Sequence, residues 1–170
     1  MLRGTIMEIF SSVWPLLILV SVIVISLRIT YIIKYKPKVI FYKEMIYFGF
    51  ILYVLCLFYV VTFQDVSWST SNYVPFKEMF RYSFGSRLFF KNVVGNMLMF
   101  MPFGFFVAYI LKLKKVWIML LLSLIVSLTI ETIQSIIGRV FDVDDIILNV
   151  IGAILGFLVF KIVYFFKLKS

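Results

Sequence analysis

The chain has 170 residues, of which 64% are hydrophobic and only 15% are charged, and its mean hydropathy is +1.10. A soluble domain of this length has too small an interior to bury so much apolar surface, so the composition excludes a soluble enzyme and indicates an integral membrane protein. The chain contains no His, which excludes imidazole bases and His metal ligands, and its net charge of +9 comes from basic residues at the ends of apolar stretches, which argues against a nucleic-acid partner.

Five continuous apolar stretches are each long enough to cross a bilayer, which takes about 20 helical residues. Because backbone groups in hydrocarbon need partners within their own segment, and because the stretches do not alternate, they are predicted to be helices. Arg28 follows the first stretch, which favours an uncleaved helix over a signal peptide. The fold class is therefore an all-α, polytopic membrane helix bundle of about five transmembrane helices. The predicted spans are Phe10–Leu27, Met45–Phe63, Val93–Leu111, Val116–Ile137 and Ile146–Phe166.

The only cysteine, Cys56, lies in the second span and is interpreted as a packing residue. The longest connection, from Gln64 to Asn92, follows that span. After Pro75, apolar residues recur every four positions while charged residues take the other faces. This pattern predicts a short amphipathic interfacial helix, with a structured loop as the alternative and Gly85-Ser86 as a point of interruption. The apolar positions are Phe76, Phe80, Phe84 and Leu88, and the charged ones are Lys77, Glu78, Arg81 and Arg87.

Polar residues at membrane depth form three groups, and each such residue costs about 2–3 kcal/mol if it faces lipid. Because the third span begins, the fourth ends and the fifth begins on the same side, the three groups are predicted to converge in one leaflet whatever the orientation. The groups are Asn92 and Asn96, with Pro102 and Gly104 following; Ser123, Ser127, Glu131 and Gln134; and Asp142, Asp145 and Asn149, with Gly152 and Gly156 following.

Several roles remain open for these residues. Asn96 and Gln134 are suited to holding helices together, Asp142 to capping the fifth helix, and Gly152 and Gly156 to close helix contact. Glu131 and Asp145 are the acids most suited to a functional site, and Arg139 is placed to pair with one acid of the group, which also includes Asp144.

The orientation is predicted from the positive-inside rule. Eleven basic residues lie on one side of the five spans and six on the other, so the N-terminus is expected outside and the C-terminus in the cytoplasm. The eleven are Arg28, Lys34, Lys36, Lys38, Lys43, Lys112, Lys114, Lys115, Lys161, Lys167 and Lys169; the six are Arg3, Lys77, Arg81, Arg87, Lys91 and Arg139.

A run of short motifs between about Val61 and Phe160 resembles the VanZ-like family. The motifs are Asn72-x-x-Pro75-Phe76, Asn92-x-x-x-Asn96, Phe100-x-Pro102-x-Gly104, Glu131-x-x-Gln134, Gly138-Arg139, Asp142-x-x-Asp145 and Asn149-x-x-Gly152. The resemblance implies a multi-pass protein of the bacterial plasma membrane, typical of Gram-positive organisms, in a family whose founding member is associated with resistance to the glycopeptide teicoplanin. It also divides the chain into an N-terminal helix with a basic cytoplasmic loop, residues 1–44, and a VanZ-like helical membrane domain, residues 45–170.

Three functions compete. The first is a non-enzymatic protein that affects antibiotic sensitivity or cell-envelope stress tolerance, through a polar pocket that binds a cell-wall precursor lipid, a lipoglycopeptide or a partner protein. The second is a membrane enzyme acting on a lipid-linked cell-wall precursor, in which Glu131, Asp142 and Asp145 hold a divalent cation and Glu131 acts as the base. The third is a transporter, which five short helices favour least unless the chain forms a homo-oligomer. For the preferred first function we expect neither a cofactor nor a metal.

Overall fold

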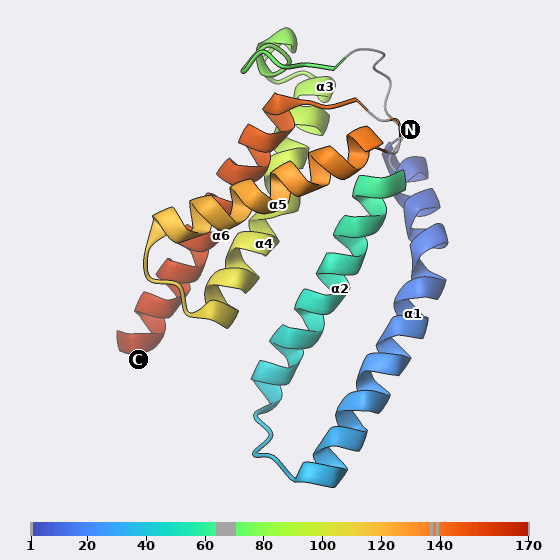
Figure 1. The fold of residues 1–170 in the computed structure, drawn as a ribbon, viewed down its shortest axis with the longest axis vertical. Coiled ribbons are helices and arrows are strands. Elements are labelled where there is room, and N and C mark those ends of the chain that lie inside the picture. Colours follow the sequence, from blue (N-terminus) through green and yellow to red (C-terminus); the bar gives the residue numbers. More distant parts are fainter. Residues whose placement is uncertain (1, 64–70, 137, 139, 170) are drawn as a thin grey trace. The chain divides into compact units, whose positions relative to one another are not determined.

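The computed structural model describes residues 2–63, 71–136, 138 and 140–169, and the regular elements in these ranges are helices (Figure 1). Five of them are long and apolar enough to cross a membrane, which confirms the predicted fold class and number of spans. The candidate spans are Leu17–Tyr35, Phe41–Tyr59, Arg87–Leu111, Val116–Ile136 and Val143–Phe165.

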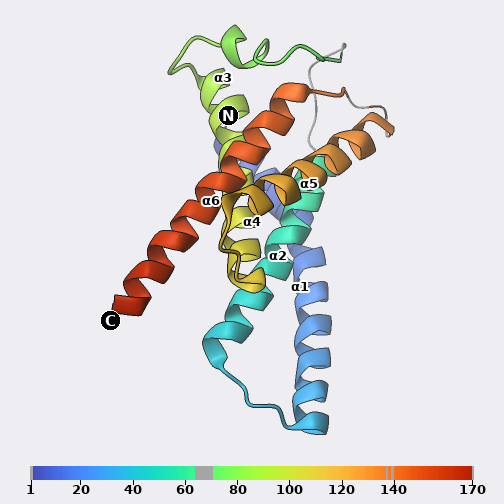
Figure 2. The ribbon, with the colours of Figure 1, turned by 60° about the vertical axis from the view of Figure 1, so that its left-hand side comes forward.

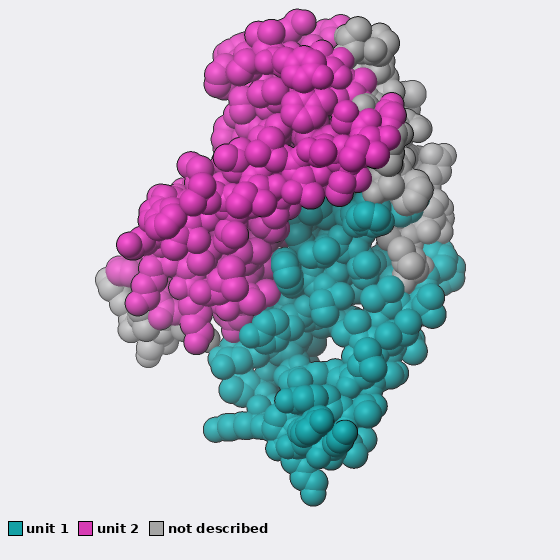
Figure 3. All heavy atoms as spheres, viewed as in Figure 1, with its two compact units in different colours: residues 1–64 teal, residues 65–170 magenta. Residues whose placement is uncertain are grey.

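The chain divides into two compact units, residues 1–64 and 65–170 (Figure 3). The first unit contains helices α1 (Leu2–Tyr35) and α2 (Phe41–Phe63). Helix α1 continues beyond the predicted end at Leu27 to Tyr35. The guanidinium of Arg28 forms a bidentate ion pair with Glu44 of α2, in which Nε donates to Oε2 at 2.7 Å. The sequence predicts a different division, after residue 44, between an N-terminal helix with its basic loop and a VanZ-like domain. That division stays a prediction.

The second unit contains the remaining helices. Helix α3 (Arg87–Phe89), the π-helical segment η2 (Phe90–Val94) and α4 (Gly95–Leu111) follow one another without a break. Helices α5 (Val116–Ile136) and α6 (Val143–Lys169) complete the unit, and α6 packs along α4 and against α5 (Figures 1 and 2). The described core of this unit includes Phe100, Ala108, Met119, Ala153 and Phe157.

Glycines set the close approach of α4 and α6. A Cβ added to Gly152 would lie 2.1 Å from the carbonyl oxygen of Met97, and one added to Gly156 would lie 1.9 Å from that of Met101. Gly104 on α4 has the same relation to Ala153 of α6, at 1.9 Å. At this separation the small residues of one helix contact the backbone of the other directly. Such close van der Waals packing is a main driving force for helix association in lipid.

The predicted amphipathic helix is largely absent. Residues 71–86, which we call the strap, form turns and a single 3₁₀ turn, η1 (Met79–Arg81). Phe76 and Gly85 both have positive φ, at 66° and 80°, so a helix cannot run through either position. The periodic Phe residues suggested a helix, but the backbone leaves the helical conformation at Phe76, at Gly85 and at Tyr82, which is extended directly after η1.

Candidate functional site

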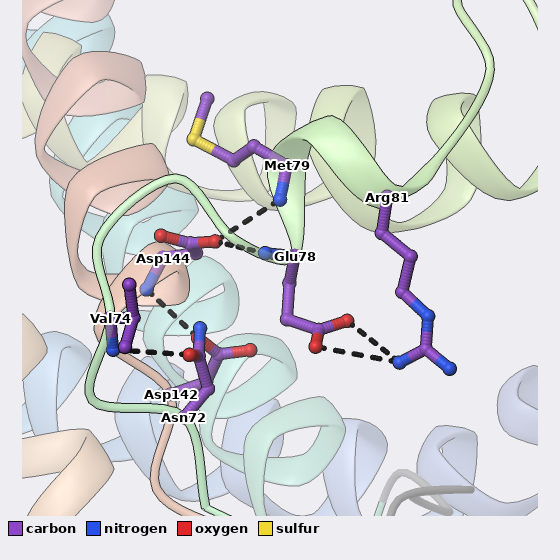
Figure 4. Close-up of polar contacts among 7 residues, drawn as sticks. All are labelled: Asn72, Val74, Glu78, Met79, Arg81, Asp142 and Asp144. Carbon is purple, nitrogen blue, oxygen red and sulfur yellow. Dashed lines mark hydrogen bonds and ion pairs between the residues drawn. The ribbon is translucent and has the colours of Figure 1, made fainter.

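The strap is fixed to the beginning of α6 by a short parallel bridge between Asn72 and Asp142. The N–H of Asn72 donates to the carbonyl of Phe141 at 2.8 Å, and the N–H of Val143 donates to the carbonyl of Asn72 at 3.1 Å. The side-chain amide of Asn72 donates to Asp142 Oδ1 at 2.9 Å, and its oxygen accepts the N–H of Val74 (Figure 4). Asn72 is 5% exposed, so this contact is part of the interior.

Asp144 is the centre of the contact between strap and helix. Its side chain is 1% exposed, and its carboxylate accepts the backbone N–H groups of Phe76, Glu78 and Met79, the last two at 2.7 and 3.1 Å (Figure 4). A buried carboxylate is costly unless its oxygens are hydrogen-bonded, and a curved run of N–H groups is a preferred partner for an anion. The strap therefore owes its shape to Asp144.

Asp142 joins the strap, α5 and α6. Its Oδ1 accepts the N–H of Asp144 at 2.9 Å, which makes Asp142 the N-cap of α6, and its own N–H donates to Glu131 Oε2 at 3.0 Å. Burial raises the pKa of the Asp142 carboxyl, and the nearby charges of Asp144 and Glu78 raise it further, while the hydrogen bonds from Asn72 and Asp144 lower it. Both of these hydrogen bonds reach Oδ1, so Oδ2 can carry a proton without breaking either.

Further into the bundle, two side-chain pairs link the helices. The amide of Asn96 on α4 donates to Asp145 on α6, and the amide of Asn149 on α6 donates to Ser127 Oγ on α5 at 3.0 Å. Asn149 is 5% exposed, and its Oδ1 is the buried side-chain oxygen for which the described residues supply no hydrogen-bond partner. The two pairs connect α4 and α5 to α6.

Tyr82, at the end of η1, connects the strap to the π-helical segment. Its hydroxyl forms a hydrogen bond with the side chain of Asn92, and burial raises the pKa of Tyr82. The π-helical segment ends where the N–H of Gly95 bonds to the carbonyl of Phe90, five residues earlier. Such an extra residue within a helix turns the side chains that follow it and is frequent at functional sites.

The predicted site residues with described contacts therefore gather at the end of α4, α5 and α6 that carries the strap, in several hydrogen-bonded groups. We call these groups together the polar cluster. Its members with described contacts are Asn72, Asn92, Asn96, Ser127, Glu131, Asp142, Asp144, Asp145 and Asn149. Gln134 is buried on the same face of α5, Pro102 lies half-buried within α4, and the predicted residue Arg139 lies outside the described residues.

Asp144, a member of the cluster, and Tyr82, which lies beside it, had no role assigned from the sequence. Asp144 was counted only as one of four acids, and its position in the first turn of α6 gave the single signal that it had a structural partner. Its partners are backbone N–H groups more than sixty residues earlier, which carry no side-chain signature. Tyr82 offered no signal apart from being a polar aromatic residue among phenylalanines.

The acids of the cluster accept hydrogen bonds from the chain itself. Glu131 accepts from Asp142, Asp144 from the strap, and Asp145 from Asn96. Among the described residues, no three Asp, Glu, Cys or His side chains are placed to hold a metal ion together. The described side chains thus hold the ends of the helices and the strap together by hydrogen bonds, at one end of the helix bundle.

Comparison with known proteins gives one finding. The family model described as VanZ/LLP1 matches residues 50–164, which is more than half of the chain and includes every described residue of the polar cluster. No curated protein and no solved structure shows significant similarity to the chain. With its five membrane-crossing helices, the chain is a multi-pass membrane protein, and it belongs to the VanZ-like family.

Proposed function

We propose that the chain is a non-catalytic protein of the bacterial plasma membrane that contributes to tolerance of glycopeptide antibiotics such as teicoplanin, or of cell-envelope stress. The observation that carries this proposal is the position of the polar cluster, which lies at one end of α4, α5 and α6 beneath the strap. Family membership supports the cellular role, because the founding member of the family is associated with teicoplanin resistance.

In this proposal the cluster faces outwards, with the N-terminus outside and the C-terminus in the cytoplasm. The turn between α4 and α5 lies at the opposite end of the bundle and carries Lys112, Lys114 and Lys115, and α6 continues to Lys161 at that same end. Counted over all five predicted spans, eleven basic residues lie on this side and six on the side of the cluster, so by the positive-inside rule this side is cytoplasmic. The polar cluster then opens towards the compartment in which cell-wall precursors are assembled and glycopeptides act.

The ligand in this proposal is the polar headgroup of a lipid-linked cell-wall precursor or of a lipoglycopeptide. Asp142 Oδ2 and Asn149 Oδ1 are two acceptors of the cluster that accept none of the described hydrogen bonds. Such groups favour a ligand rich in hydroxyl and amide donors. The alternative of a metal-dependent enzyme receives less support, because each carboxylate that would hold the ion already accepts a hydrogen bond from the protein. Glu131 accepts from the N–H of Asp142, Asp142 from Asn72, and Asp145 from Asn96.

Deletion of the gene in its host tests the resistance role. We expect lower resistance to teicoplanin, restored by the wild-type gene, and unchanged resistance would contradict the proposal. Complementation with alanine variants of Asn96, Glu131, Asp142, Asp145 and Asn149, scored for membrane abundance as well as susceptibility, separates a binding role from a structural one. A binding role predicts at least one variant with normal abundance that fails to restore resistance.

The proposed orientation is tested separately by cysteine labelling, because Cys56 is the only native cysteine. In a Cys56→Ser background, a membrane-impermeant thiol reagent applied to intact cells should label Ser83→Cys in the strap and spare Lys114→Cys in the turn between α4 and α5. The reverse pattern would place the polar cluster in the cytoplasm and remove the proposed encounter with extracellular ligands.

A further inference from the structure

The strap and the first turns of the helix that follows it expose large aromatic side chains. Phe80 is 83% exposed, Phe84 is 91% exposed and Phe90 is 57% exposed. Exposed apolar groups gathered on one short segment mark an interaction surface rather than ordinary scatter. These residues directly precede or begin the span Arg87–Leu111, so the surface lies at the level where that helix leaves the bilayer.

The same segment is strongly basic. Lys77, Arg81, Arg87 and Lys91 are all exposed, and the acid among them is Glu78, which pairs with Arg81 at 3.1 Å. Cations interspersed with exposed aromatic rings are typical of protein surfaces that lie in the headgroup layer, where rings contact acyl chains and cations contact phosphates.

The strap that carries the exposed rings is held to the beginning of α6 by hydrogen bonds of its backbone. Three N–H groups at the start of η1 and just before it bond to Asp144, and Ser86 Oγ accepts the N–H of Phe89 at 3.1 Å. Phe84 contacts Phe89, with ring centroids 5.1 Å apart, on the exposed side of the segment. The rings are thus presented outwards by a backbone that is already ordered, so little entropy is lost when they insert.

We propose that residues 76–91 form an interfacial anchor that binds anionic phospholipids of the leaflet beside the polar cluster. Phe80 and Phe84 insert among the headgroups, and Lys77, Arg81, Arg87 and Lys91 contact the lipid phosphates. The inference is independent of the proposed role in resistance, because its ligand is the bilayer itself. Charge complementarity and continuity with a membrane-spanning helix favour a lipid surface over a soluble protein partner.

Spin labels in nanodiscs test the insertion. In a Cys56→Ser background, labels at Phe84→Cys and Phe80→Cys should collide more with oxygen, which concentrates in lipid, than with a water-soluble nickel chelate. Phe58→Cys on α2, 61% exposed along a predicted span, serves as the lipid-facing reference, and Lys114→Cys serves as the polar reference. Phe80 and Phe84 are exposed, so substituting them leaves the core intact. If labels at positions 80 and 84 collide more with the nickel chelate than with oxygen, the anchor is overturned and the surface is free for a water-soluble partner.

Lipid charge tests the second half of the proposal. Label depth at position 84 should increase when phosphatidylglycerol is mixed into phosphatidylcholine nanodiscs. Lys77→Gln together with Lys91→Gln should abolish this increase, with a loss of roughly fivefold in preference for the anionic lipid per cation removed. The matched pair Lys112→Gln and Lys114→Gln, at the other end of the bundle, should leave the increase intact. A depth that does not depend on phosphatidylglycerol in the wild-type protein would overturn the assignment of anionic lipid.

Discussion

At the scale of single residues, Asp144 and Asp142 differ in how their oxygens are used, although they are two positions apart. Asp144 uses both oxygens of its carboxylate to hold three N–H groups of the strap. Asp142 has its described hydrogen bonds on Oδ1 alone. An Asn side chain offers one acceptor oxygen and one donor group. Replacement by Asn should therefore be tolerated at position 142, where one oxygen accepts the described bonds, and not at position 144, where both do.

Asp144→Asn should therefore destabilise the second unit. The introduced NH₂ group would face the N–H groups of Glu78 and Met79 or of Phe76, and hydrogen bonds to a charged acceptor contribute about 1.5–3 kcal/mol each. We expect a loss of roughly 2–4 kcal/mol, measured as a lower unfolding temperature in detergent and lower membrane abundance. Asp142→Asn is the matched control and should stay within about 1 kcal/mol of the wild type; equal losses in the two variants would contradict this division of roles.

The raised pKa of Asp142 predicts a pH dependence of stability. Because burial raises the folded-state pKa above the unfolded value, the folded protein holds this proton more tightly than the unfolded chain. The contribution of Asp142 to stability is thus complete below about pH 4 and is lost as the pH rises through the raised pKa. The unfolding temperature of the wild type relative to Asp142→Asn should fall as the pH rises above about 4. If the unfolding temperature of the wild type relative to Asp142→Asn stays constant or rises with pH, burial does not destabilise the ionised form of the Asp142 carboxyl.

At the scale of elements, the packing of α4 on α6 depends on three glycines that leave no room for a methyl group. Gly104, Gly152 and Gly156 each bring a carbonyl of the facing helix to within about 2 Å of the position of a Cβ. The close helix contact predicted for Gly152 and Gly156 is made with α4 of the same chain. Gly95, by contrast, has only an ordinary contact of 3.6 Å at that position.

Gly156→Ala should force α4 and α6 apart. Inserting a methyl group against the backbone near Met101 costs about 1–3 kcal/mol, or more where the backbone itself must move. We expect a lower unfolding temperature and reduced abundance in the membrane. Gly95→Ala is the matched control and should be neutral or stabilise by up to about 1 kcal/mol, because alanine favours a helix more than glycine does; similar behaviour of the two variants would argue against the close packing.

The elements also separate what a sequence can predict from what it cannot. The spans were predictable because each apolar run must satisfy its backbone internally, and only the ends of the helices moved, as when α6 began at Val143 rather than Ile146. The strap was not predictable, because Phe76, Phe80 and Phe84 have helical spacing although φ is positive at Phe76 and at Gly85. The turn around Phe76 is held by Asp144, which is more than sixty residues away, and local periodicity cannot reveal so distant a partner.

At the scale of the whole molecule, the meeting of the polar residues follows from the number of spans between them. Asn96, Glu131 and Asp145 were expected at one end because two crossings return the chain to the same leaflet. The individual pairings could not be predicted from the sequence and are seen only in the structure. Asn96 bonds to Asp145, whereas Glu131 accepts the backbone N–H of Asp142. The bridge that joins Asn72 to Asp142 had no sequence signal beyond the presence of both residues in the family motifs.

The central claim is that segments far apart in sequence assemble into the polar cluster at one end of the second unit. Oxidative cross-linking of Asn72→Cys with Asp142→Cys, in a Cys56→Ser background, tests it most directly. Partners in a β-bridge have Cα atoms about 5 Å apart, which is within the range of a disulfide. We predict rapid, nearly complete disulfide formation in membranes for this pair and none for Asn72→Cys with Lys114→Cys. A well-expressed Asn72→Cys/Asp142→Cys protein that does not cross-link would show that the strap is not attached to α6 and that the cluster does not exist.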